Sequence, residues 1–170
     1  MNVTELLSIA PILSLTSLSI IVLLINAFVK QSQEISYWLS VIGLVICIVV
    51  AINTMGQTGA VLNNMIIAGG YSNFFAVVFL CSSLLTVLLS YGFLKNNHSS
   101  VGEFYLLILF SALGMMLMAA SADLIVTFLG LELMSISLYV LAGFLRKRIK
   151  SNESSLKYFL LGAFATGFLL

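Results

Sequence analysis

Charged residues are scarce in this chain of 170 residues: only 8% are Asp, Glu, Lys or Arg, and there is a single proline. Soluble domains carry about 25% charged residues, so this composition excludes an ordinary soluble domain. Hydrophobic residues make up 61% of the chain, and the mean hydropathy is +1.18. The sequence therefore predicts an integral membrane protein.

Sequence signals for cofactor binding are also missing. The chain has no glycine-rich dinucleotide loop, no cysteine cluster for iron and sulfur, and no paired histidines for haem. Cys47 and Cys81 each lie inside an apolar run, where packing is favoured over a disulfide or a metal site. His98 lies alone in a polar loop. We expect this chain to bind no metal, cofactor or nucleic acid, and to perform no redox chemistry itself.

Long apolar runs dominate what is present. A spanning helix needs about 20 apolar residues, and a sixth run, beginning near Leu156, reaches Leu170 after only about 15 residues or 22 Å of helix. The sequence predicts an all-α, polytopic transmembrane helix bundle with its sixth helix truncated, and hence an N-terminal fragment of a longer protein. A β-barrel is disfavoured because barrel strands alternate apolar and polar residues. The six predicted helices are about 9–29, 37–56, 71–94, 104–122, 124–145 and 156–170.

The basic residues predict the orientation. Lys30, Lys95 and a cluster over 146–150 follow alternate helices, and the other two loops contain no Lys or Arg. The positive-inside rule then places these cations inside and the N-terminus outside. Loop 57–70 becomes an outer loop, in which 61–67 is predicted as a short interfacial segment. A bacterial inner membrane is the default because no transit-peptide composition is present, with an organellar energy-transducing membrane as the alternative.

One carboxylate interrupts the fifth run, FLGLELMSISLYVL. Asp123 is a plausible N-cap, and Glu132 follows it by nine residues or about 13 Å, close to the middle of the membrane. A charge there costs about 2.5 to 3.5 kcal/mol on insertion scales, so the side chain should face protein or water. Ser135 and Tyr139 lie on the same helix face, where their hydroxyls could support a hydrated proton path. The alternative is a structural glutamate bonded to a neighbouring helix.

Lys157 is a second candidate, about one turn into the sixth helix in ESSLKYFLLGAFATGFLL. Its long stem could also reach the nearby interface, so the residues alone leave a proton-transfer role and a snorkelling role open.

These two segments carry a resemblance. SADLIVTFLGLELMSISLYVLAGF, a short basic loop and ESSLKYFLLGAFATGFLL resemble the fifth and sixth helices of the antiporter-like subunit N of proton-pumping respiratory complex I, the NADH:quinone oxidoreductase. They are similar, more distantly, to its sister subunits M and L and to the large subunits of multisubunit sodium/proton antiporters. The resemblance is specific over 103–170, whereas residues 1–102 match only in helix number and topology.

The resemblance implies roles for the two charged residues. Glu132 corresponds to the family's helix-5 glutamate, which pairs with a lysine on a seventh helix, and Lys157 to a lysine at the start of helix 6. Both would transfer protons, with Ser135 and Tyr139 as a supporting polar face. Residues 1–101 would form three peripheral helices, and 102–170 the start of the antiporter-like repeat. Everything after the sixth helix of the family is missing from this chain.

The resemblance also implies a function. The chain would be a proton-translocating membrane subunit of a quinone-reducing respiratory complex, and an enzyme only as part of that translocase. Quinone, iron–sulfur clusters and, as a candidate, FMN would bind to partner subunits. Its partners would be the other antiporter-like and small membrane subunits and the lipid bilayer. The rival function is a subunit of a multisubunit sodium/proton antiporter, which needs no electron transfer; a third hypothesis is an assembly scaffold.

Overall fold

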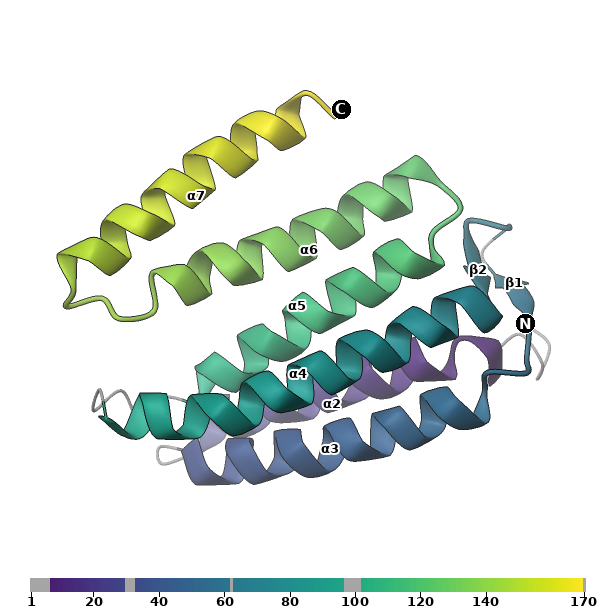
Figure 1. The fold of residues 1–170 in the computed structure, drawn as a ribbon, viewed down its shortest axis with the longest axis horizontal. Helices are drawn as coiled ribbons and strands as arrows, with labels where there is room; N and C mark the ends of the chain where they lie inside the picture. The colour runs from purple at the N-terminus through teal and green to yellow at the C-terminus, as the bar shows by residue number, and fades with distance from the viewer. Residues whose placement is uncertain (1–6, 30–32, 62, 97–101, 170) are drawn as a thin grey trace.

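A bundle of long helices makes up the computed structural model, which describes residues 7–29, 33–61, 63–96 and 102–169 (Figure 1). The predicted all-α transmembrane bundle is confirmed, because five helices, α2 to α6, are long and apolar enough to cross a membrane. The elements in these ranges are α2 (Ala10–Phe28), α3 (Gln33–Asn53), β1 (Gly59–Val61), β2 (Ile66–Ala68), α4 (Gly70–Asn96), α5 (Glu103–Ala120), α6 (Leu124–Ala142) and α7 (Ile149–Gly167).

Two helix starts bear on the site. Asp123 is the N-cap of α6, and its carboxylate accepts a hydrogen bond of 2.8 Å from the Ile125 amide, as the sequence predicted. Helix α7, however, begins at Ile149 rather than near Leu156. The prediction was wrong here because it followed the apolar run alone. Residues 149–155, which are polar except for Ile149, are also helical and extend the N-terminal end of α7.

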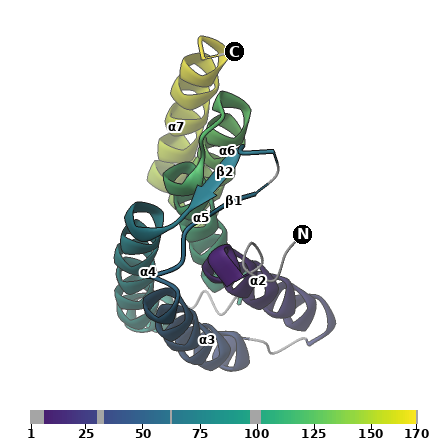
Figure 2. The same cartoon turned by 90° about the vertical axis from the view of Figure 1, so that its right-hand side faces the viewer.

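Helix α5 is the centre of the bundle. It packs against α2 and α4 on one side and α6 on the other, and α7 lies beyond α6 at the edge (Figures 1 and 2). In an 18-residue window of each helix, 56% of the α5 residues are buried, against 17% of the α6 residues. Tyr105, Leu109 and Met116 of α5 are almost completely buried. One face of α6 is therefore committed to the core, and the opposite face is left for α7.

A β-hairpin forms in loop 57–70, where the sequence predicted a short interfacial segment over 61–67. Strands β1 and β2 are antiparallel, with Val61 paired to Ile66. Asn63 and Asn64 have φ angles of 54° and 66°, in the left-handed region that asparagine tolerates better than most residues. The Ala122 amide donates a 2.8 Å hydrogen bond to the Met65 carbonyl. The hairpin thus contacts the turn from which α6 begins.

The described loop cations gather at the end of the bundle opposite the hairpin. Lys95 lies in the last turn of α4, Arg146 and Lys147 lie in the connection from α6 to α7, and Lys150 lies in the first turn of α7 (Figure 1). Lys30 and His98 lie outside the described residues. The positive-inside rule requires these cations to share one end of the bundle. Which side of the membrane this end faces stays a prediction.

Candidate functional site

The rotation of α6 is set by a close crossing with α5. A Cβ atom on Gly114 would lie 2.6 Å from both the Gly130 carbonyl oxygen and the Met134 amide nitrogen. Such contacts require glycine, whose missing side chain lets two helix backbones approach. Glu132 follows Gly130 by two residues, a rotation of about 200°, so it leaves α6 on the side away from α5.

Glu132 is the most unusual group on that side. Its Oε1 atom is buried and has no hydrogen-bond partner among the residues that the structure describes. Leaving a buried polar group unpaired costs about 1 to 3 kcal/mol, and more for a charged one. Ser135, one turn further along the same side, is also buried. Buried polar atoms of both residues therefore lie on the side of α6 that turns away from α5.

Tyr139 links this face to α7. Its ring lies edge-on to Phe159, with centroids 6.2 Å apart, and a Cβ atom on Gly162 would overlap its hydroxyl. The Ser155 hydroxyl donates a 2.8 Å hydrogen bond to the Tyr139 carbonyl oxygen, and that of Ser151 donates one of 2.6 Å to Ala142. Helix α7 is thereby held against the side of α6 that carries Glu132.

Lys157 does not join this group. Its Nζ atom lies 2.6 Å from Oε1 of Glu153, one turn earlier on α7, and the two side chains are 69% and 57% exposed. Within the described ranges, no ion pair connects Lys157 to Glu132. The structure therefore brings Glu132, Ser135 and Tyr139 together on one face of α6 and places Lys157 elsewhere. Glu153 was missed in the sequence, although its spacing of four residues before a lysine is a recognised helix pairing signal.

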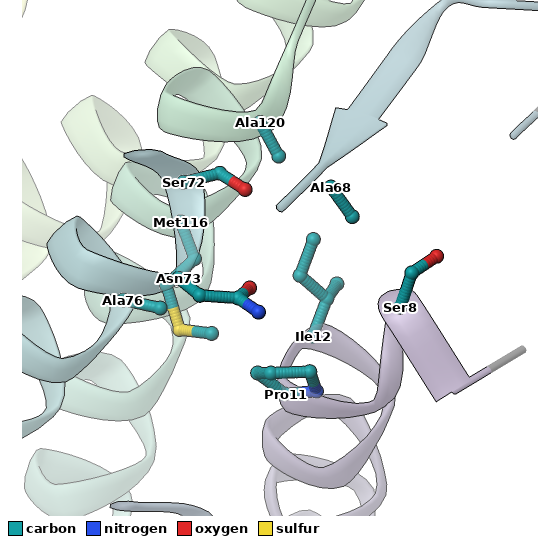
Figure 3. A pocket seen from close by; sticks show the side chains of 9 residues that line it. All are labelled: Ser8, Pro11, Ile12, Ala68, Ser72, Asn73, Ala76, Met116 and Ala120. Carbon is teal, nitrogen blue, oxygen red and sulfur yellow. The ribbon is translucent and has the colours of Figure 1, made fainter. Parts of the chain in front are cut away.

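A separate small cavity lies at the hairpin end of the bundle (Figure 3). Ser8, Ser72 and Asn73 contribute polar side chains to its lining, and Met116 closes it from α5. Its volume of about 10 Å³ is enough for at most one water molecule. Asn73 also donates a 2.8 Å hydrogen bond to the Thr54 carbonyl, so it ties α4 to the end of α3. None of the predicted site residues lines this cavity.

Metal ligands do not cluster in the part of the chain that the structure describes: no group of three or more His, Cys, Asp or Glu side chains there could hold an ion. Cys47 and Cys81 are both free, the first buried and the second exposed. The unpaired carboxyl group of Glu132 is consequently the feature with the clearest chemistry.

Known proteins resemble this chain over nearly its whole length. A family model described as "NADH:quinone oxidoreductase/Mrp antiporter, TM" matches residues 121–170, which include both Glu132 and Lys157. The NADH-quinone oxidoreductase subunit N of Trichlorobacter lovleyi is 48% identical over 163 residues, covering 95% of this chain and 34% of that protein. Subunit N 1 of Solibacter usitatus is 41% identical over 170 residues, covering 99% and 35%.

A solved structure has a similar fold. A chain of the respiratory complex I from Thermus thermophilus, determined with bound aureothin, superimposes with a TM-score of 0.79 at 33% identity. The match covers 93% of the present chain and 34% of the other. The chain thus spans about a third of the length of the curated relatives it matches.

Proposed function

We propose a function on the premise that this chain belongs to the family of NADH-quinone oxidoreductase subunit N. As part of the complete subunit, it translocates protons in a quinone-reducing respiratory complex. It is a multi-span membrane subunit, and electron transfer would take place on quinone and iron–sulfur clusters in partner subunits. The other membrane subunits of the complex would be its partners. We place it in a bacterial inner membrane with its N-terminus outside.

The observation that carries this proposal is the unpaired, buried Oε1 atom of Glu132. A carboxyl group at this depth is neutral when protonated and demands a counter-charge when ionised. A cation that moved towards or away from it would supply or withdraw that counter-charge, and the resemblance implies a lysine beyond residue 170 for this role. Ser135 and Tyr139 would carry the proton towards or away from Glu132 through their hydroxyls and water.

Glu132→Gln tests the proposal, because it keeps the side chain's shape and removes its proton. The variant should be made in the full-length protein, and the assembled complex reconstituted into vesicles for simultaneous measurement of quinone reduction and proton uptake. We expect proton translocation to fall by about tenfold or more, since a positioned acid–base group contributes about 10² to 10⁴ in rate. Glu34→Gln, at an exposed position in the first turn of α3, is the matched control.

Undiminished translocation by an assembled Glu132→Gln complex would overturn the role of this residue. If Glu132→Ala also left transport intact, the chain would be an assembly scaffold.

A sodium/proton antiporter subunit is the second candidate, since the matching family model is described by both kinds of protein. Affinity purification of the full-length protein in mild detergent, followed by mass spectrometry, separates the two. Recovery of hydrophilic iron–sulfur subunits supports the respiratory complex. Recovery of small membrane partners alone, with sodium-dependent transport, supports the antiporter.

A further inference from the structure

Glu153 and Lys157 form a charged pair on the face of α7 that points away from α6. Ser151 and Ser155 mark the opposite face, because their hydroxyls bond to carbonyl oxygens of α6. Glu153 follows Ser151 by two residues and Lys157 follows Ser155 by two, and each step is a rotation of about 200°. Helix α7 therefore separates this pair from Glu132.

The pair is also displaced from Glu132 along the helix axis. The bond from Ser155 to the Tyr139 carbonyl puts Lys157 near the final turn of α6, whereas Glu132 lies about 10 Å before Tyr139. Helical side chains lean towards the N-terminus of their own helix. The Lys157 ammonium accordingly leans towards Glu153 and the basic loop, in the direction opposite to the depth of Glu132.

The residues around the Lys157 ammonium offer it Glu153 as a counter-charge. Leu160 and Phe164 continue the same stripe of α7 and are large, apolar and exposed. The other charged residues near the start of α7 are basic: Arg146, Lys147, Arg148 and Lys150. The ionisable groups of α6, Glu132 and Tyr139, lie on the other side of α7. Glu153 is consequently the carboxylate that compensates the charge of Lys157, at 2.6 Å.

We propose that Glu153 is a positioning residue that holds the Lys157 ammonium on the outer face of α7, so that the pair forms a second charged site of the proton path, separate from Glu132. The inference rests on the proposed function and deepens it. Lys157 then serves the path through its pair with Glu153 and does not neutralise Glu132. The second site lies nearer to the basic end of the bundle, where a proton would enter or leave from the water.

Four variants of the full-length protein in the assembled complex test this: Glu153→Gln, Glu153→Asp, Lys157→Gln and the double variant Glu153→Gln/Lys157→Gln. Glu153→Gln should lower proton translocation by about threefold or more, because it leaves Lys157 without its partner. Glu153→Asp should restore most of the rate by keeping the carboxylate one turn from Lys157. The double variant should translocate no more slowly than Lys157→Gln alone, because Glu153 acts only through Lys157.

Controls and outcomes separate this inference from the proposed function. Lys150→Gln, an exposed cation in the first turn of α7, should translocate normally. Normal translocation by Glu153→Gln beside a defective Glu132→Gln overturns the inference alone, as does a double variant slower than Lys157→Gln. Normal translocation by both Glu132→Gln and Glu153→Gln overturns the proposed function and the inference together.

Discussion

The hydroxyl of Tyr139 on α6 occupies the space over Gly162 on α7, where a side chain would otherwise lie. Together with the hydrogen bond from Ser155 to the Tyr139 carbonyl, this contact holds α7 against the Glu132 side of α6. The relationship therefore determines which helix covers the candidate proton carrier.

Gly162→Ala should consequently destabilise the α6–α7 contact. The added methyl group would meet the rigid Tyr139 ring, and overpacking of this kind costs about 1 to 3 kcal/mol. Gly167→Ala is the matched control on the same helix, since nothing lies within 4 Å of a Cβ atom there. Thermal unfolding of the purified full-length subunit in detergent should show a lower midpoint for Gly162→Ala only; equal midpoints would contradict the contact.

The α5–α6 crossing predicts a larger effect at Gly130. A Cβ atom there would lie 2.9 Å from the Gly114 carbonyl oxygen and 3.0 Å from the Met118 amide nitrogen, and backbone cannot move aside as a side chain can. We expect Gly130→Val to cost about 3 kcal/mol or more and to reduce the amount of assembled complex. Gly92→Val, with open space around it on α4, should assemble normally. Normal assembly of both variants would show that the helices are further apart.

The N-cap of α6 gives a prediction at the hairpin end. Asp123→Ala removes the acceptor for the Ile125 amide, and loss of a cap costs about 0.5 to 2 kcal/mol. Asp123→Asn retains an acceptor oxygen and should unfold close to the wild-type temperature. The same thermal measurement distinguishes the two, and an unchanged midpoint for Asp123→Ala would mean that the hairpin contact alone keeps α6 in place.

Orientation in the membrane can be tested with single cysteines. Gln57→Cys lies at the hairpin end and Lys147→Cys at the basic end, and both positions are exposed. In a full-length protein lacking its native cysteines, a membrane-impermeant maleimide should label Gln57→Cys in intact cells and Lys147→Cys only after permeabilisation. The reverse pattern would invert the predicted orientation.

Several parts of the site were predictable because they depend on one helix at a time. The length of the apolar run and the Asp123 cap locate Glu132 near the middle of α6. The helical period then places Ser135 and Tyr139 on its face. The hairpin was missed because its two strands have only three residues each, and its turn depends on two asparagines in the left-handed region.

The sequence by itself determined a bundle of helices long and apolar enough to span a membrane, with one carboxylate near the middle of α6, because the bilayer imposes a helix length and the helical repeat assigns residues to faces. Only the tertiary structure decided that α5 covers one side of α6 and α7 the other, and that Lys157 turns away from Glu132 towards Glu153. The physical reason is that the rotation of one helix against another depends on contacts between distant residues. Gly114 with Gly130 and Tyr139 with Gly162 are such contacts, and no periodicity within a single helix records them.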